Sequence, residues 1–466
     1  MKCIFTFDEI KRAMTAQLLN APKNGLDGHI SSVVTDTRED CADSLFIAIK
    51  GENFDGHAFC SAAIEKGAAA LCVNSADALS SQVKVPVFVV EDTTKALQSL
   101  ALFHRRRLGG LTVTALTGSC GKTSTKEMIR SIYSAAFGES AVYATAGNTN
   151  NHVGVPQNIL NLNEKHKICV LEMGTNHPGE IEVLSKIAEP DISVITMVGH
   201  SHLEFFGDLK GVAQEKAAIF SHMNAAGTAI IPDDTPSLKV IEKAASKFNV
   251  MRFGCGKNSE IQVKYLGGNI SGSSFELFSK ESKETVIVNW KLSGRHQTVN
   301  AGAAACAGLA VGIDLKTIAS GLENCVLPGM RMKTTVRNDT TWINDAYNAN
   351  PDSVISALTW LSEFSNPSHL VIVLGDMLEL GETTMESHQK VLRFAAEKFK
   401  DAKVVAIGPK MIAACADRSF KAGEEILTFE SSDKAAESVR LLACRGCTVF
   451  LKGSRGMKLE KIEPSE

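Results

Sequence analysis

The sequence predicts an α/β protein made of three successive domains, each with its own sheet. The chain of 466 residues is too long for one ordinary core, which indicates two or three domains. Its hydrophobic content of 44% and charged content of 22% are typical of a soluble globular protein. Short, continuously apolar runs alternate with amphipathic helical patterns. This alternation is typical of parallel strands that helices bury on both faces.

The first domain, residues 1–108, is predicted to be a small α/β unit. Short apolar runs alternate here with helical patterns. The pattern breaks at Leu108-Gly109-Gly110, where we place the first boundary. The expected strands cover 44–51, 67–73 and 85–91, and the expected helices cover 61–67 and 93–107.

The second domain, residues 109–325, contains four fully apolar runs, each separated by enough chain for a crossover helix. A doubly wound parallel sheet follows from this pattern. Between about 250 and 290 the hydrophobicity alternates and Gly and Ser interrupt it, which predicts an appended antiparallel hairpin. The four apolar strands are expected at 111–116, 167–173, 191–198 and 227–232.

The third domain, residues 326–466, follows a linker near Asn324 to Gly329 and repeats the alternation of strands and helices. We expect a second doubly wound sheet here. Its strands are expected at 340–346, 369–375, 403–408 and 447–453, and two of its helices at 353–364 and 388–399.

The charge balance argues against a polyanionic partner. With 49 Lys and Arg against 52 Asp and Glu, the formal net charge is -3, so we expect no nucleic-acid partner. Asp8 and Glu9 stand where a secretory segment would be apolar, and no run of 18 apolar residues occurs. We therefore expect a cytoplasmic protein without a membrane segment, and we separately expect a monomer.

Twelve cysteines are scattered singly, except for the pair Cys444 and Cys447. A thioredoxin-type pair opens a helix after a strand, whereas this pair lies between a helical pattern and an apolar strand. No second pair completes a zinc site. We interpret the two as reduced structural thiols.

A phosphate-binding loop is predicted between the first strand of the central domain and its helix. The pattern G-x-x-x-x-G-K-[ST] would place its first glycine at position 116, which is Leu116. However, Gly118 and Gly121 allow backbone N–H groups to converge on a phosphate in a strand-turn-helix context. The alternative is a tight turn with an exposed lysine. The expected ATP contacts in this loop are Thr117, Gly118, Ser119, Cys120, Gly121, Lys122, Thr123 and Ser124.

A Mg²⁺ site is predicted where the neighbouring strands end. Glu172 ends the next strand, and His200 and His202 follow the one after it. The carboxyl ends of neighbouring strands face one crevice of a doubly wound sheet. Mg²⁺ prefers oxygen ligands and tolerates an imidazole as one member of the shell. We therefore predict Thr123, Glu172 and His202 as ligands, and His200 as a supporting group.

Two asparagine-rich loops, 146–156 and 343–353, border apolar strands. Such loops are usually turns, but these two offer several amide donors and acceptors at once, which suits a polar or peptide substrate. Lys216 lies in an amphipathic helix, where a surface lysine would be ordinary.

Taken together, these motifs resemble the Mur ligases of peptidoglycan synthesis, whose phosphate loop is the short Gly-x-x-Gly-Lys form. The likeness spans nearly the whole chain in the family's order. The segments that carry it are VTDTR, GENFDGHAF, TGSCGKTSTKEM, GNTNNHVGVP, LEMGTNHPGEI, GHSHLEFFG, VAQEKAAIF, PGMRMK, INDAYNANPDS, VLGDMLELGE and LKGSRG.

The resemblance implies an N-terminal domain that holds the UDP end of a sugar nucleotide, a central P-loop-type ATP-binding domain and a Rossmann-like C-terminal domain. The branch that the motifs favour joins D-alanyl-D-alanine to UDP-N-acetylmuramoyl-tripeptide, with ATP and Mg²⁺, through an acyl phosphate.

The resemblance also assigns residues. It implies catalytic roles for Lys122, Lys216, His202 and Arg331, with Lys216 carbamylated. Asn300 and Arg331 are implied nucleotide contacts. The implied substrate contacts are Thr35, Thr37 and Asn53 for UDP, Asn148, Asn150 and Asn151 at the domain junction, and Asp345, Asn348 and Asn350 near the amino substrate.

Two alternatives stay open from the sequence. One is another ligase of the superfamily, such as a different Mur ligase or a folylpolyglutamate synthetase. The other is a P-loop switch that uses ATP to drive binding. Phosphate release that requires an acceptor amine distinguishes a ligase from a switch.

Overall fold

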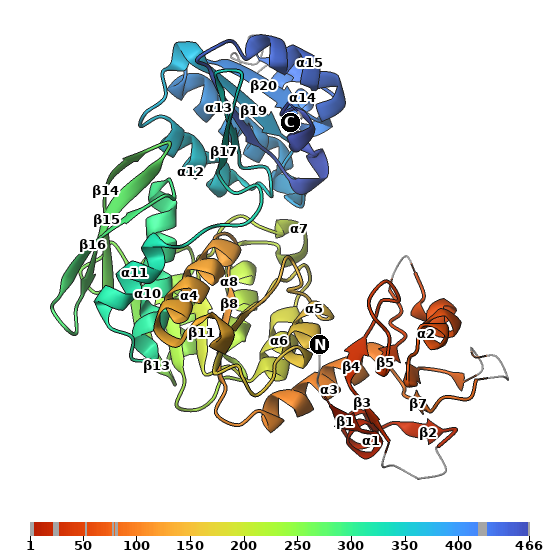
Figure 1. Ribbon diagram of the computed structural model, residues 1–466. Helices are drawn as coiled ribbons and strands as arrows, with labels where there is room; N and C mark the ends of the chain where they lie inside the picture. Colours follow the sequence, from red (N-terminus) through yellow and green to blue (C-terminus); the bar gives the residue numbers. More distant parts are fainter. Residues whose placement is uncertain are drawn as a thin grey trace.

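A computed structural model of the chain describes residues 4–21, 28–51, 54–76, 79, 83–417 and 426–464. It contains three α/β parts in chain order, and the N-terminal and C-terminal parts both adjoin the central one (Figure 1). This confirms the predicted fold class. Within the described residues, no helix is long and apolar enough to cross a membrane.

The N-terminal part is built on a five-stranded sheet in the order β2-β7-β6-β5-β4. Strands β4 to β7 run parallel and β2 pairs antiparallel with β7. β1 pairs antiparallel with β3 beside it. The elements are β1 (Phe5–Thr6), α1 (Phe7–Met14), β2 (Gln17–Leu19), β3 (His29–Ile30), β4 (Ser32–Val34), β5 (Ser44–Ile47), η2 (Gly56–Phe59), α2 (Cys60–Glu65), β6 (Ala70–Val73) and β7 (Val87–Val89).

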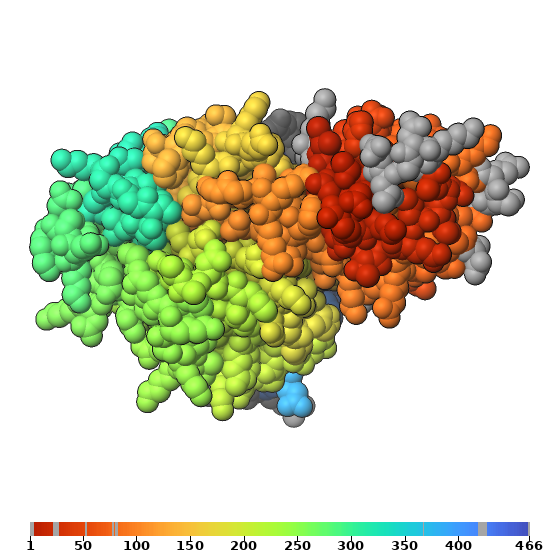
Figure 2. All heavy atoms as spheres, turned by 90° about the horizontal axis from the view of Figure 1, so that it is seen from below, coloured from red at the N-terminus to blue at the C-terminus, as the bar shows by residue number. Residues whose placement is uncertain are grey.

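Helix α3 (Thr93–Arg107) joins the N-terminal part to the central one. Asp92 caps its first turn by accepting from the backbone N–H groups of Thr94 and Lys95. Its apolar residues, including Leu97, belong to a hydrophobic core that also contains residues of the N-terminal and central parts. In Figure 2 the red N-terminal residues accordingly adjoin the orange segment that leads into the central domain.

The central part is a nine-stranded sheet in the order β16-β15-β14-β13-β12-β11-β8-β10-β9. Strands β8 to β14 are parallel to one another, whereas β14, β15 and β16 form an antiparallel meander. The strands are β8 (Thr112–Thr117), β9 (Val142–Ala144), β10 (Ile168–Glu172), β11 (Ile192–Ile195), β12 (Thr228–Pro232), β13 (Asn249–Gly254), β14 (Ile261–Asn269), β15 (Gly272–Ser279) and β16 (Thr285–Trp290).

Helices cover both faces of the central sheet, as its continuously apolar strands predict. One face packs against α3, α5, α6, α8 and α9, and the other against α4, α10 and α11. The helices are α4 (Lys122–Phe137), α5 (Gly154–Leu160), α6 (Glu180–Ala188), α7 (Leu203–Phe206), α8 (Leu209–Ala217), α9 (Leu238–Ala245), α10 (Arg295–Ala310) and α11 (Leu315–Glu323).

The C-terminal part is a six-stranded sheet in the order β17-β18-β22-β19-β20-β21, parallel except for β17. Helices α12, α13 and α14 pack on one face and α15 on the other. The elements are β17 (Lys333–Arg337), β18 (Thr340–Asn344), α12 (Pro351–Leu361), β19 (Leu370–Gly375), η7 (Gly381–Thr383), α13 (Thr384–Lys398), β20 (Lys403–Ile407), α14 (Pro409–Ala416), β21 (Leu427–Phe429), α15 (Ser432–Leu442) and β22 (Thr448–Lys452).

The alternating segments expected between about 250 and 290 form the antiparallel strands β14, β15 and β16, which extend the central sheet at one edge. This meander also reaches the C-terminal part, because Ile270, in the turn between β14 and β15, packs on that part's core. The phenol of Tyr265 donates to Glu363 Oε2 at 2.8 Å. The meander is therefore a second support between these two parts.

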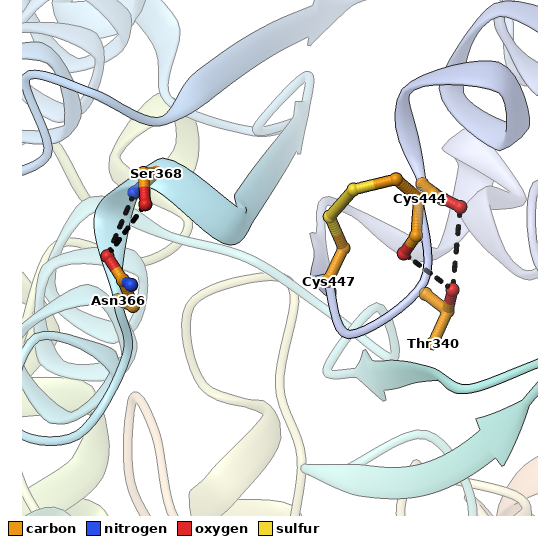
Figure 3. Close-up of a disulfide and its surroundings, with 6 residues drawn as sticks. Thr340, Asn366, Ser368, Cys444 and Cys447 are labelled. Atoms are coloured by element: carbon orange, nitrogen blue, oxygen red, sulfur yellow. Dashed lines mark hydrogen bonds between the residues drawn. A yellow bond between two sulfur atoms is a disulfide. The ribbon is translucent and has the colours of Figure 1, made fainter.

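The expectation of two reduced thiols is wrong in this structure, because Cys444 and Cys447 form a disulfide (Figure 3). The backbone N–H of Cys447 donates to Cys444 O at 3.0 Å, which closes a tight turn between α15 and β22. The Thr340 hydroxyl donates to the carbonyl groups of Ala443 and Cys444 and holds that turn in place. The two Cα atoms lie 5.4 Å apart, within the usual disulfide range.

Candidate active site

The predicted phosphate loop connects β8 to α4 at the carboxyl edge of the central sheet. Gly118 and Gly121 have φ angles of 155° and 82°, which disfavour any residue with a Cβ. A Cβ on Gly118 would collide with Thr196 Oγ1, and one on Gly121 would lie 2.5 Å from Asn300 Oδ1. The loop therefore keeps its shape only with glycine at both positions, and Asn300 packs directly against it.

The loop that follows β11 braces the phosphate loop. Ser119 N donates to Met197 O at 2.9 Å, and the Ser119 hydroxyl donates to Gly199 O at 3.1 Å. In return, Gly199 N and the Ser201 hydroxyl donate to Ser119 Oγ at 3.0 and 2.8 Å. Thr196 Oγ1 also donates to Cys120 O at 2.5 Å. The structure thus fixes the backbone of residues 118–121 from one side.

The first residues of α4 point their polar groups into the site. Lys122 Nζ donates to Gly118 O at 2.7 Å, which folds the ammonium over the loop. The Thr123 hydroxyl donates to Glu172 Oε1 at 3.2 Å and accepts from Arg331 Nη2 at 3.0 Å. The structure therefore brings Thr123, Glu172 and Arg331 into direct contact, and Lys122 precedes Thr123 along the chain.

Glu172 offers an oxygen suited to a cation. Its side chain is 1% exposed, and Oε1 also accepts from Asn150 Nδ2 at 2.9 Å. Its second oxygen, Oε2, is buried and has no hydrogen-bond partner among the described residues. A buried carboxylate oxygen without a partner is unfavourable, so a bound cation would satisfy it. This donor set fits Mg²⁺.

His202 faces the C-terminal domain through one ring nitrogen. Its Nδ1 lies 2.6 Å from Glu379 Oε2, and hydrogen bonding to His202 lowers the pKa of Glu379. His202 adopts a left-handed backbone, with φ of 52°. The part of the chain that the structure describes contains no convergent group of three or more His, Cys, Asp or Glu residues. The metal-binding role of His202 stays a prediction.

Arg331 reaches the site from the linker between the central and C-terminal sheets. Its guanidinium stacks 3.7 Å from the centroid of the Tyr347 ring, and Nη1 donates to Pro328 O at 3.1 Å. These contacts leave Nη2 directed at Thr123. A cavity of about 220 Å³ opens beside Arg331. It is also lined by Ile270, Lys291, Leu292, Ser293, Gln297, Leu327, Met332 and Thr334.

Lys216, on α8, is almost completely buried, with 1% of its surface exposed. Burial, and secondly the charge of Lys122, lower its pKa from 10.5 to about 7. The neighbouring Glu215 is already occupied, since its carboxylate accepts from Thr175 Oγ1 and from the backbone of Gly179 and Ile181. Lys216 is thus a buried amine with much of its population neutral near pH 7.

Side chains of the first asparagine-rich loop, 146–156, contact both the carboxylate of Glu172 and the start of α5. Asn150 donates to Glu172 and to Asn148 Oδ1, at 2.9 and 3.3 Å. Asn151 Oδ1 accepts from the backbone of Val153 and Gly154 and so stabilises the start of α5. Asn150 therefore lies at the site, whereas the amide oxygen of Asn151 has a local structural role.

The second such loop places the C-terminal domain against the phosphate loop. Asn350 caps α12 by accepting from Ser353 N, and its Nδ2 donates to Cys120 Sγ at 2.9 Å. Asp345 Oδ2 is held by Lys452 Nζ at 2.6 Å. Lys452 Nζ also donates to Asn348 O at 3.2 Å. Asn350 therefore contacts the predicted phosphate loop directly.

Of the residues expected to contact UDP, Thr35 lies at the junction of the N-terminal and central domains, and Thr37 contacts a lysine of the N-terminal domain. The Thr35 hydroxyl accepts from Gln157 Nε2, on α5, at 2.7 Å. Thr37 O accepts from Lys66 Nζ at 2.6 Å. Asn53 lies outside the described residues. The remaining loop residues, Thr117 and Ser124, are buried, and Thr117 Oγ1 donates to Met173 O at 2.8 Å.

Several groups at the site were missed by the sequence reasoning. Thr196 carries no motif of its own, and its contacts depend on how β11 lies beside β8. Ser201 lies inside a segment that carried the family resemblance, but nothing distinguished it there. Tyr347, Asp352, Glu379 and Lys452 lie inside segments that carried the family resemblance, but no pattern distinguished them from their neighbours. Gln157 gave no signal in the sequence.

Comparison with known families defines the class of protein. Three family models match consecutive parts of the chain. They are described as Mur ligase family, catalytic domain, at residues 29–105; Mur ligase middle domain, at 116–308; and Mur ligase, glutamate ligase domain, at 330–455. The chain belongs to the Mur ligase family.

Individual relatives narrow the comparison. The UDP-N-acetylmuramoyl-tripeptide–D-alanyl-D-alanine ligase of Bacillus subtilis is 35% identical over 437 residues, covering 93% of this chain and 92% of that protein. A crystal structure of MurF from Acinetobacter baumannii matches with a TM-score of 0.90 at 30% identity, over 99% of this chain and 98% of that one. MurF ligase from Thermotoga maritima in complex with ADP matches with a TM-score of 0.80 at 26% identity, over 92% and 96%.

Proposed function

We propose that this chain is an ATP-dependent ligase that joins D-alanyl-D-alanine to UDP-N-acetylmuramoyl-tripeptide in the synthesis of peptidoglycan precursors. The observation that carries the proposal is the phosphate loop shaped by Gly118 and Gly121, with Thr123 bonded to both Glu172 and Arg331. The names of the full-length relatives supply the substrates.

In this proposal each of the three domains binds a different substrate. Residues 1–108 hold the UDP end of the sugar nucleotide, 109–325 bind ATP, and 326–466 bring in the amino substrate. Thr35, Thr37 and Asn53 contact the UDP moiety in this proposal. Asn148, Asn150 and Asn151 guide the peptide past the domain junction, and Asp345, Asn348 and Asn350 border the amine.

The nucleotide is held by a helix N-terminus and three side chains. Backbone N–H groups at the start of α4 face the phosphates, and Lys122 and Arg331 balance their charge. Asn300 contacts the nucleotide from α10, and the cavity beside Arg331 receives the base. Thr123, Glu172 and His202 would hold Mg²⁺. This ion supplies positive charge next to the transferred phosphoryl group.

A carboxylate is a poor electrophile, so the proposed mechanism first converts it into an acyl phosphate. A terminal carboxylate oxygen of the tripeptide attacks the γ-phosphorus of ATP, the bond to the β-γ bridging oxygen breaks, and ADP leaves. The amine of D-alanyl-D-alanine then adds to the carbonyl of the acyl phosphate. It loses a proton, and inorganic phosphate departs as the amide forms. Lys122 and Arg331 stabilise the negative charge during the first transfer.

Lys216 is proposed to carry a carbamate. Only a neutral amine attacks CO₂, and a pKa of about 7 makes neutral amine abundant at physiological pH. The product is an anion, so it would remove the repulsion between Lys216 and Lys122 and provide oxygen atoms toward the metal.

The decisive experiment incubates the protein with ATP, Mg²⁺, D-alanyl-D-alanine and either the diaminopimelate- or the lysine-containing UDP-muramoyl tripeptide. Mass spectrometry of the products and phosphate release are measured together. We expect one new amide per phosphate released, only when all components are present. Phosphate release without the acceptor amine would identify a nucleotide switch, and ligation of a different amino acid would identify another ligase of the superfamily.

A further inference from the structure

Asp352, in the first turn of α12, makes a contact that the proposed mechanism does not use. Its Oδ2 accepts two hydrogen bonds from His200, from the backbone N–H at 2.9 Å and from ring Nδ1 at 3.0 Å. A Cβ added to Gly199 would lie 2.7 Å from this same oxygen. The carboxylate of the C-terminal domain thus sits directly on residues 199–200 of the central domain.

Residues 199–201 are the same segment that braces the phosphate loop. Gly199 exchanges hydrogen bonds with the Ser119 side chain in both directions, and the Ser201 hydroxyl donates to the same oxygen. One short segment therefore has the phosphate loop on one side and Asp352 on the other. His202, the predicted metal ligand, follows directly along the chain.

The position of Asp352 is itself fixed by its helix. Asn350 and Ser353 form a reciprocal capping box at the start of α12, which sets the direction of the first turn. The Asn350 amide simultaneously contacts Cys120. In Figure 1, α12 lies on the side of the C-terminal domain that faces the central one. Two adjacent parts of the phosphate site thus receive contacts from one helix end.

We propose that Asp352 is a positioning residue for the nucleotide: by holding His200, it keeps segment 199–201 against Ser119 and so keeps the phosphate loop in its binding shape. The inference rests on the proposed function, since it assigns the loop to ATP. It adds that a residue of α12, outside the central domain, supports the shape of the phosphate loop.

The test measures binding of MgADP by isothermal titration calorimetry, which needs no ligase turnover. Asp352→Ala removes both hydrogen bonds and is expected to weaken binding by about tenfold. His200→Ala removes only the ring contact and is expected to weaken it by about threefold. Because Asp352 acts through His200, the double variant should bind within about twofold of Asp352→Ala alone.

A control and a kinetic readout separate positioning from general stability. Glu363→Ala removes the acceptor of the Tyr265 hydroxyl, near the other end of α12, and should leave MgADP affinity within about twofold of wild type. In steady state, Asp352→Ala should raise KM for ATP more than it lowers kcat. Asp352→Asn, whose Oδ1 still accepts from His200, should recover part of the affinity. If circular dichroism shows that Asp352→Ala is unfolded, the MgADP affinities of His200→Ala and Asp352→Asn decide whether Asp352 positions the loop.

The outcomes for the two proposals are distinct. If the wild-type protein binds MgADP but ligates no acceptor, the proposed function is overturned. The MgADP affinities of the variants then still decide the role of Asp352. Unchanged MgADP affinity in Asp352→Ala overturns the inference alone. Effects of Asp352→Ala and His200→Ala that multiply in the double variant overturn it as well, because they would then act independently.

Discussion

Replacing Lys216 by methionine is expected to make the protein more stable near neutral pH while stopping ligation. Lys216 is 1% exposed, and the charges of Glu215 and Glu180 offset only part of the effect of this burial on its pKa. Burial, together with the charge of Lys122, lowers its pKa from 10.5 to about 7. Methionine fills a similar volume without a charge, so the variant avoids the cost of burying an ammonium.

The size of the effect follows from the two pKa values. In the unfolded chain the lysine titrates near its ordinary pKa, whereas in the folded protein it is half neutral near pH 7. Linkage then gives a cost of about 4 kcal/mol at pH 7, as an upper limit. The cost is complete below pH 7 and is relieved as the pH rises toward 10.5. In this window the unfolded state binds more protons, so wild-type stability rises relative to the variant.

The assay is urea unfolding followed by tryptophan fluorescence at pH 6.5, 8 and 9.5, in buffer freed of CO₂ so that no carbamate forms. The midpoint of Lys216→Met should exceed that of wild type at pH 6.5, and the difference should shrink at each higher pH. Lys126→Met is the matched control. Lys126 is also buried, but it donates to Thr145 O at 2.6 Å and pairs with Glu127 at 2.9 Å. Its removal should destabilise the protein at pH 6.5.

A difference between wild type and Lys216→Met that stays the same from pH 6.5 to 9.5 would refute the lowered pKa. So would a Lys216→Met variant that is less stable than wild type at pH 6.5. The carbamate proposal would then lose its physical basis, because a lysine with an ordinary pKa offers little neutral amine.

Three further predictions concern the nucleotide site. Lys122→Ala removes the main counter-charge of the phosphates and should lower the rate of phosphate release by at least ~10²-fold. Tyr347→Leu removes the ring beneath Arg331 and should lower kcat by about tenfold, while Tyr347→Phe keeps the ring and should stay within about twofold of wild type. Cys120 should react with iodoacetamide more slowly than the exposed Cys255, as judged by peptide mass spectrometry, because burial raises the pKa of the Cys120 thiol.

Each of these predictions has an outcome that contradicts it. Phosphate release by Lys122→Ala at a near-normal rate would remove the phosphate loop from catalysis. Equal kcat values for Tyr347→Leu and Tyr347→Phe would show that stacking does not position Arg331. Labelling of Cys120 ahead of Cys255 would mean that Asn350 does not cover the thiol, and therefore that α12 is not docked.

Local patterns predicted much of the fold because buried parallel strands are continuously apolar and helices are amphipathic. The strands at 112–117, 168–172 and 192–195 and the helix that begins at Lys122 were all expected. The short edge strands β9 and β21 were not, since three residues give too little pattern. β17 was missed for another reason. It is an edge strand that pairs only with β18, and its mostly polar residues give no apolar run.

Cys444 and Cys447 illustrate the limit of spacing alone. The distance of three residues along the chain is compatible with reduced thiols, a metal site or a disulfide. The turn closed by the backbone of Cys447 and held by Thr340 decides among them, and that turn depends on β22 pairing beside β18.

The sequence alone determined the chemical inventory: a glycine-shaped loop before a helix, a lysine and a threonine at its end, and a glutamate at the end of the neighbouring strand. These follow from local backbone preferences and from the direction of parallel strands, which a linear pattern records. Only the tertiary structure decided that Arg331 contacts Thr123, that Asn350 touches Cys120 and that Asp352 holds His200. Those contacts join residues more than a hundred positions apart, and the packing of two separate sheets brings them together.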